Sequence, residues 1–187
     1  DDEPLTGRSA ALKVELGGGE TPLNLKEYIN VDLKDYSTVN ISGIDFEKLN
    51  SIDCRLPFQD DTVSEIYCAH CLEHILPYRG LLREIVRVCH IGALVKFIVP
   101  HWNCCIAKTN DHKHTVSEEQ IRHWMYLKAW FSGCTKKLKS LDNYHKPGYD
   151  FDRAKILFPH LTNQEIMDFI PNTCCESHYT LTVVENK

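Results

Sequence analysis

Short apolar runs alternate with helical patterns along the first half of the chain. The apolar runs predict β-strands at residues 12–16, 28–33, 51–53, 63–69 and 93–99. Apolar residues at helical spacing predict short helices at residues 44–49, 72–76 and 81–89. Strands and helices that alternate in this way are typical of an α/β fold built on a mostly parallel sheet.

The connection between the first two predicted strands is short. About 11 residues separate them, which leaves room for only one or two helical turns. We therefore expect the first helix of this α/β fold to be stunted.

The second half of the chain has a weaker pattern. Ser117 is a good cap for a helix that carries Ile121 and Trp124 on its apolar face, and a short helix is predicted at residues 163–169. The chain closes with alternating β-branched residues at 178–185. A terminal strand of this kind can insert between earlier strands, so we expect about seven strands with the last one antiparallel.

Length and charge narrow the classes of protein. The chain has 187 residues, the size of one large domain or two small ones, and a net charge of −5. No overall positive field attracts nucleic acid, so a nucleic-acid partner is not expected. The densest basic cluster, Lys136, Lys137 and Lys139, is interpreted as a solvated face. No apolar run is long enough to predict a membrane span.

The nine cysteines do not suggest a disulfide framework. Two of the pairs, at 104–105 and 174–175, are adjacent in sequence, and the others are dispersed. This pattern favours a reduced, cytoplasmic setting. Cys68 and Cys71 form a C-x-x-C, but no second pair follows at zinc-knuckle spacing, so a buried thiol is the simpler interpretation of Cys68. The chain starts at Asp1, which is compatible with one domain of a larger multidomain enzyme.

A glycine turn and a carboxylate form a nucleoside-binding pattern near the start of the chain. The first predicted strand runs into Gly17-Gly18-Gly19, and Asp32 ends the second strand 13 residues after Gly19. Glycines let backbone N–H groups approach a ligand closely. A carboxylate at the end of the next strand can accept hydrogen bonds from two ribose hydroxyls.

The order of further motifs resembles the class I S-adenosylmethionine-dependent methyltransferases, in their small methyltransferase-11-like branch. The resemblance covers residues 12–101 and the terminal strand. It rests on the segments Tyr-Ile-Asn-Val-Asp (28–32), Asp-x-x-Leu-Pro-Phe (53–58), Leu-Glu-His-Ile (72–75), Arg-Glu-Ile-x-Arg-Val (83–88) and Val-Pro-His (99–101). It implies a Rossmann-like α/β fold with S-adenosylmethionine as cofactor, and it disfavours a dehydrogenase, which would usually carry Gly-x-Gly-x-x-Gly and a full first helix.

The resemblance also implies which residues hold the cofactor. They are Glu15, Gly17, Gly19, Asp32, Asp53, Cys54, Ala69 and His70. The first three would shape the loop around the methionine part, and Asp32 would hold the ribose. Asp53 and the Cys54 backbone would face the adenine, while Ala69 and His70 would border the methionine end.

A group of metal-ligand type follows the fourth strand. His70, Glu73 and His74 stand at i, i+3 and i+4, which places them on one face of a helix, and His101 follows the fifth strand. The set resembles the Glu-x-x-Glu-His of ubiquinone-biosynthesis and small-RNA 2′-O-methyltransferases, with His70 in place of the first Glu. Imidazole and carboxylate ligands suit Mn²⁺, Fe²⁺ or Zn²⁺ better than Mg²⁺. The alternative is that Glu73 and His74 only cap and pack the helix.

Three residues are candidates for a general base. His101 follows the fifth predicted strand, and Asp111 and His114 belong to the polar cluster 111–114 that leads into the next helix, where the resembling branch often has Asp-x-x-His. A hydroxyl that must lose its proton needs such a group within reach. The alternative for each is a solvent-exposed loop residue.

These features together predict an O-methyltransferase that acts on a sugar, glycan or small polyol, with a possible metal assisting. The segment after the fourth strand lacks the Asn/Asp-Pro-Pro-aromatic motif of enzymes that methylate amines in DNA. An RNA ribose 2′-O-methyltransferase and a non-catalytic cofactor-binding domain are the alternatives.

The predicted organisation is an N-terminal extension followed by one methyltransferase domain. The extension covers residues 1–11 and the domain residues 12–187. Within the domain we expect a cofactor-binding half at 12–101, an acceptor region at 102–176 and a closing strand at 177–187. The acceptor region is assigned to specificity because long insertions at strand ends usually carry function.

Overall fold

A computed structural model of the chain describes residues 11–22, 27–50, 54–126, 131, 133–148, 150–169 and 174–187. The strands are β1 (Leu12–Leu16), β2 (Ile29–Val31), β3 (Val63–Ala69), β4 (Cys89–Pro100), β5 (Lys136–Pro147) and β6 (Cys174–Glu185). The α-helices are α1 (Arg79–Val88), α2 (Glu118–Tyr126), α3 (Phe151–Leu157) and α4 (Asn163–Phe169). Three short 3-10 helices are η1 (Phe46–Asn50), η2 (Leu72–His74) and η3 (Cys105–Lys108). None of the described helices has the length and apolar character needed to cross a membrane.

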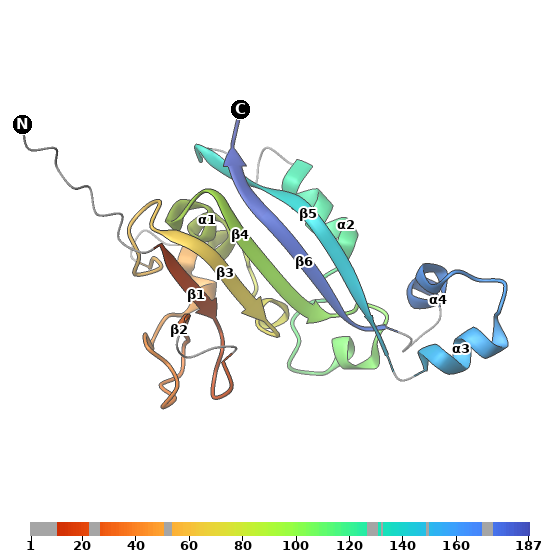
Figure 1. The fold of residues 1–187 in the computed structure, drawn as a ribbon. Helices are drawn as coiled ribbons and strands as arrows, with labels where there is room; N and C mark the ends of the chain where they lie inside the picture. Colours follow the sequence, from red (N-terminus) through yellow and green to blue (C-terminus); the bar gives the residue numbers. More distant parts are fainter. Residues whose placement is uncertain are drawn as a thin grey trace, which may run out of the picture.

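The six described strands form one sheet in the order β2-β1-β3-β4-β6-β5 (Figure 1). β1 pairs in parallel with β2 and β3, and β3 pairs in parallel with β4. β6 lies between β4 and β5 and is antiparallel to both. This confirms the mostly parallel sheet and the antiparallel terminal strand. The sheet has six strands in the described part of the chain rather than about seven, and the predicted strand at 51–53 lies outside that part.

The edge strand β5 was not predicted from the sequence. Its twelve residues are mostly exposed, and its exposed positions mix polar residues such as Lys139, Asp142 and Asn143 with Leu141 and Tyr144. An edge strand with polar residues on both faces loses the alternation that marks a half-buried strand. The predicted acceptor region 102–176 therefore contributes both β5 and α2 to the main body of the fold.

The helices α1 and α2 pack on one face of the sheet (Figure 1). Alternate residues of β4, including Val95 and Phe97, are fully buried on this face, and Trp124 of α2 packs its ring against Phe97. The intervening residues of β4 are only partly buried. No helix occurs in the described part of the β1–β2 connection, as the stunted first helix predicts. The face that such a helix would normally cover instead carries charged pairs such as Lys96 with Glu65.

Hydrogen bonds between the motifs at 53–58 and 83–88 fasten the segment before β3 to α1. Arg87 forms a bidentate ion pair with Glu84, with Nε–Oε1 and Nη2–Oε2 distances of 2.8 and 2.7 Å. The same guanidinium donates to the carbonyl oxygens of Leu56 and Phe58, and Glu84 Oε2 accepts the Leu56 N–H. These contacts fix residues 56–58, which follow shortly after the predicted adenine-binding residue Cys54.

The helices α3 and α4 form a small outlying unit between the end of β5 and the start of β6 (Figure 1). They share a separate small core, made of Phe151, Ala154, Ile166, Met167 and Cys174. Residues 163–169 are helical as predicted, whereas α3 was not predicted from the sequence.

Candidate functional site

The site lies at the edge of the sheet where the parallel strands end. β1, β2, β3 and β4 run in the same direction, so the residues that follow them meet at one edge. Ligands of open α/β sheets bind at this carboxyl edge. Gly17, Asp32, His70 and His101 all follow strands there.

The glycine turn after β1 has the backbone that only glycine adopts easily. Gly17 and Gly19 have φ angles of +73° and +53°. A Cβ on Gly17 would lie 2.4 Å from Cys71 Sγ, so the turn sits directly against the end of β3. The turn is also tied to β2, because Gly18 N–H donates to Asn30 Oδ1 at 3.2 Å.

Asp32 is placed to accept further hydrogen bonds. Its Oδ2 accepts the Gly19 N–H at 3.1 Å, and its Oδ1 accepts the Lys34 N–H at 3.0 Å. The residue is half-buried, and each carboxylate oxygen keeps a second lone pair. This geometry holds the carboxylate rigidly beside the glycine turn and suits two ribose hydroxyls.

The other predicted cofactor residues surround this turn. Glu15 is buried beneath it, with 3% of its surface exposed, and Ala69 ends β3. Cys54 Sγ contacts the carbonyl oxygen of Asp45 at 3.8 Å. Asp53 lies outside the described residues.

His70 stands directly after β3 with a left-handed backbone, φ +50°. Its Nδ1 lies 3.6 Å from Glu73 Oε1 and its Nε2 lies 3.5 Å from Glu176 Oε1. Hydrogen bonding to Glu73 is the main cause that raises the pKa of His70, with the Glu176 charge acting in the same direction. The half-exposed ring therefore bridges two carboxylates at the site edge.

Glu73, His74 and His112 form a compact group beside His70. One ligand atom from each of the three lies within 4.8 Å of the other two. Both carboxylate oxygens of Glu73 are buried without a hydrogen-bond partner among the described residues, and so is Nδ1 of His112. The polar groups nearest to this carboxylate are the imidazoles of His70, at 3.6 Å, and His112, at 4.0 Å, both longer than a hydrogen bond. A buried carboxylate held this loosely is costly, and a bound cation would offset that cost.

The ring of His74 is already oriented for a ligand. Its Nδ1 lies 3.0 Å from the carbonyl oxygen of Asp111. A carbonyl only accepts, so Nδ1 carries the proton and the Nε2 of the neutral ring keeps its lone pair. Metal-binding histidines are commonly held by such a second-sphere carbonyl.

The predicted fourth ligand, His101, does not join this group. Its ring lies with His145 and Cys174 in a second group of three potential ligands. His101 is 1% exposed, and burial lowers its pKa to about 4, with the neighbouring His145 acting in the same direction. Burial also raises the pKa of Cys174 to about 12. A ring this buried cannot reach an acceptor as a general base, which corrects that prediction.

The other two predicted bases, Asp111 and His114, lie in the loop before α2. His114 Nε2 lies 3.0 and 3.1 Å from the carbonyl oxygens of Leu72 and Ile75, so this nitrogen is a donor to η2. Asp111 is exposed, and a hydrogen bond from Thr109 lowers the pKa of its carboxyl group, which makes it a weak base. The Asp-x-x-His segment thus fastens the loop before α2 onto η2 rather than supplying a base.

Sequence reasoning missed His112 and Glu176. His112 lies at an interior position of the Asp-x-x-His segment, and Glu176 lies in β6, far from the motifs in sequence. Only the folding of the loop 105–116 onto η2, through the Lys113 N–H bond to the Glu73 carbonyl, brings His112 to Glu73. The signal that could have found it is the dense run of histidines at 112–114.

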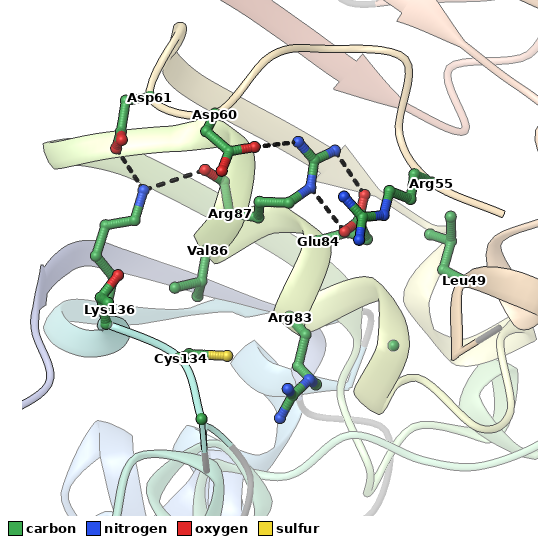
Figure 2. A pocket seen from close by; sticks show the side chains of 13 residues that line it. Leu49, Arg55, Asp60, Asp61, Arg83, Glu84, Val86, Arg87, Cys134 and Lys136 are labelled. Carbon is green, nitrogen blue, oxygen red and sulfur yellow. Dashed lines mark hydrogen bonds and ion pairs between the residues drawn. The ribbon is translucent and has the colours of Figure 1, made fainter. Parts of the chain in front are cut away.

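A cavity of about 520 Å³ lies at the opposite edge of the sheet, between α1 and the start of β5. Figure 2 shows ion pairs between five of its charged side chains: Arg87 with Asp60 and Glu84, and Lys136 with Asp61. Lys136 Nζ also donates to the carbonyl oxygens of Arg87 and Cys89. Because these charges are already satisfied, we place the functional site at the carboxyl edge and not in this cavity.

Neither the models of known protein families nor the curated protein sequences give a match to the chain. Solved structures do. A SAM-dependent methyltransferase from Archaeoglobus fulgidus is similar over 92% of this chain and 86% of its own, with a TM-score of 0.59 and 15% identity. The 16S rRNA (adenine(1408)-N(1))-methyltransferase of Catenulisporales acidiphilia, solved with SAM, aligns over 96% and 88% with a TM-score of 0.54 and 12% identity.

The same fold also occurs in a protein named for another reaction. The [4+2]-cyclase SpnF aligns over 92% of this chain and 74% of its own, with a TM-score of 0.53 and 13% identity. At such identities the similarity concerns architecture, and the chemistry must be argued from the site. The strand order, the antiparallel terminal strand and these structural neighbours establish that the chain has the fold of the class I SAM-dependent methyltransferases.

Proposed function

We propose that this protein transfers a methyl group from S-adenosylmethionine to a hydroxyl oxygen of a sugar, glycan or small polyol, with a divalent ion bound by Glu73, His74 and His112. The observation that carries the proposal is Glu73. Its buried carboxylate has no partner at hydrogen-bond distance among the described residues, and it lies among the imidazoles of His70, His74 and His112, soon after the strand that ends beside the glycine turn.

The residues at the carboxyl edge fit S-adenosylmethionine. Within the glycine turn the space beside Gly19 is open, since the nearest atom to a Cβ there is Tyr36 Cε2 at 3.9 Å, so a ligand can approach the backbone at this residue. Asp32 is held beside it, ready for ribose hydroxyls. Ala69 ends β3 and His70 follows it directly, and the resemblance found in the sequence assigns both to the methionine end of the cofactor. These residues would bind and orient the methyl donor beside η2.

The ligand set fits a divalent transition metal. One carboxylate and two imidazoles suit Mn²⁺, Fe²⁺ or Zn²⁺ better than Mg²⁺, which prefers oxygen ligands. When bound, such an ion supplies Lewis-acid chemistry that lowers the pKa of an acceptor hydroxyl and can orient two neighbouring oxygens. The ligand set expected from the sequence was His70, Glu73, His74 and His101. The proposed set keeps Glu73 and His74, adds His112, and includes neither His101 nor His70, which lies beside the group.

The reaction itself is a direct displacement. The acceptor oxygen attacks the methyl carbon, the carbon–sulfur bond breaks, and the hydroxyl proton leaves to the half-exposed His70 ring or to water. The Glu73 and Glu176 carboxylates flank His70 and fix its orientation. The acidic charge of the chain, −5, supports a small hydroxyl acceptor over RNA.

Methyl transfer from labelled S-adenosylmethionine should be measured with sugar nucleotides, glycans, polyols and RNA ends. We expect transfer to a sugar or polyol, loss of it after exhaustive chelation, and recovery with Mn²⁺ or Zn²⁺. Glu73→Gln and His112→Asn should lower the rate by about 100-fold or more. His123→Asn, an exposed histidine of α2, is the matched control and should retain full activity.

The outcomes separate the alternatives. Transfer to RNA alone would replace the proposed acceptor, and cofactor binding without transfer to any acceptor would indicate a non-catalytic domain. Full activity in the chelated enzyme would remove the metal from the proposal.

A further inference from the structure

A second group of metal-ligand side chains lies where three strands meet the outlying helical unit. His101 follows β4, His145 lies in β5 and Cys174 begins β6. One donor atom from each lies within 4.8 Å of the others, and the three residues are only 1%, 8% and 1% exposed. The two buried imidazoles need a structural reason, because a polar ring is costly to desolvate when its nitrogens lack partners.

The backbone holds the three residues together. The His101 N–H donates to the carbonyl oxygen of Cys175 at 3.0 Å. In the β5–β6 ladder, His145 stands opposite Ser177, and Pro147 stands opposite Cys174. The convergence therefore follows from strand pairing and does not depend on a side-chain rotamer alone.

Each of the two imidazoles has a ring nitrogen that could bind a metal, but only His145 already has the supporting hydrogen bond of a ligand. His101 Nε2 is buried and has no hydrogen-bond partner among the residues that the structure describes. His145 Nδ1 lies 3.1 Å from Ser177 Oγ, a contact that fixes the ring and leaves its other nitrogen for a ligand. The Asn103 N–H donates to His101 Nδ1 at 3.3 Å, which places the proton of the neutral, metal-free ring on Nε2. Metal binding through Nε2 would move that proton to Nδ1 and break this long hydrogen bond.

We propose that His101, His145 and Cys174 bind a Zn²⁺ ion that fastens the α3–α4 unit to the sheet. Two imidazoles and one thiolate are typical zinc ligands, and tetrahedral bonding brings such donors to about 3.3–3.6 Å from one another. The 4.8 Å bound requires shifts of only about 1 Å to reach this. On binding, a Zn–S bond forms and the thiol proton is released to solvent.

Candidates for the fourth position lie beside the group. The charges of Cys104 and Asp168 both act on Cys174, and the Asn103 side chain donates to the Asp168 carbonyl at 3.3 Å. Asp168 belongs to α4, so its carboxylate can link that helix to the ion directly. A site closed by protein ligands has a structural role and not a catalytic one.

The location explains why a metal is useful there. Cys174 is at once a zinc ligand in the proposal and a member of the separate small core shared by α3 and α4. Cores of this size stabilise a unit poorly, and small units are commonly held by disulfides or metals. All nine cysteines are free, so no disulfide performs this task.

Cobalt substitution tests the proposal directly. The full-length, tag-free protein is stripped of metal and titrated with Co²⁺, and the near-ultraviolet charge-transfer band of a cobalt thiolate is recorded. The group at Glu73 contains no sulfur, so the band reports the Cys174 group alone. Zinc content and the effect of Zn²⁺ on the melting temperature are measured in parallel.

We expect the wild type to show the band and to melt at a higher temperature with Zn²⁺. Cys174→Ser should abolish both effects, and His145→Asn should weaken Co²⁺ binding. Cys134→Ser, a half-buried cysteine at the opposite edge of the sheet, should behave like the wild type.

The proposal does not depend on methyl transfer. The band should persist in Glu73→Gln, which removes a ligand of the proposed active-site ion only. Absence of the band in the stripped and cobalt-loaded wild type would overturn the zinc site whether or not any variant folds. A band that persists unchanged in Cys174→Ser would overturn it as well.

Discussion

The motifs that carry the family resemblance contain two kinds of residue. Some stabilise the fold, and others lie where a ligand would bind. Arg87 and Glu84 belong to the first kind, since their bidentate pair clamps the segment at 56–58 onto α1. Asp32 and Glu73 belong to the second, since their carboxylates lie at the carboxyl edge with capacity for further partners. Membership in one of these motifs therefore does not by itself place a residue in the functional site.

The clamp makes Arg87 sensitive to a conservative change. Lysine keeps the charge but cannot form the bidentate pair or donate to both carbonyl oxygens, so Arg87→Lys should lower the free energy of unfolding by about 2–3 kcal/mol. Urea denaturation measures this loss. Arg122→Lys, which affects the exposed ion pair of Arg122 with Glu118, should cost less than about 0.5 kcal/mol. Equal effects would show that the clamp adds nothing.

The glycine turn gives a second test at the scale of the residue. Gly17 and Gly43 both have positive φ, but a Cβ meets Cys71 only at Gly17. We expect Gly43→Ala to cost about 1–2 kcal/mol from backbone strain alone, and Gly17→Ala to cost about 1–3 kcal/mol more from the contact. Thermal and urea unfolding measure the difference. If the two substitutions cost the same, the turn does not press against the end of β3.

Among the elements, η2 depends on the loop that folds over it. Glu47 of η1 accepts the Leu76 N–H at 2.7 Å and Lys113 Nζ at 2.5 Å. The Glu47 side chain therefore links three parts of the chain: η1, Leu76 just after η2, and the loop that carries His112. The position of His112 beside Glu73 rests on this junction.

The junction should weaken in acid. Hydrogen bonding from Lys113 holds the pKa of Glu47 below its ordinary value of 4.5. A lowered pKa means that the stabilisation is complete above that value and is lost as the pH falls through the lower folded-state pKa. Glu47→Gln should cost about 0.5–1 kcal/mol at neutral pH, a difference that shrinks below about pH 4. Urea unfolding at the two pH values measures it, with the exposed Glu20→Gln as control. A cost that is independent of pH would contradict the electrostatic account.

Elements differ in how far the sequence could predict them. β3 and α4 fall on the predicted residues because apolar spacing and caps are local signals. β5 and α3 could not be predicted in this way, since most of their residues are exposed. At the site, Asp32 and Glu73 were predicted from motifs. His112 and the separation of His101 from Glu73 depend on loop packing, which leaves no local pattern.

The whole molecule combines a methyltransferase sheet with one open face and two groups of potential metal ligands. The described part of the short β1–β2 connection contains no helix to cover the polar face of the sheet, while the carboxyl edge keeps the glycine turn and Asp32. The proposed methyl transfer depends on this carboxyl edge, because the methyl donor must bind there before any acceptor can react.

Isothermal titration with S-adenosylhomocysteine, the demethylated product of the cofactor, tests this claim most directly. The wild type should bind one molecule, and Asp32→Ala should weaken binding by at least about tenfold, which corresponds to the loss of two charge-assisted hydrogen bonds from ribose. Asp35→Ala, an exposed aspartate in the same loop, should bind as the wild type does. Absence of binding by the wild type, or unchanged affinity in Asp32→Ala, would contradict the account.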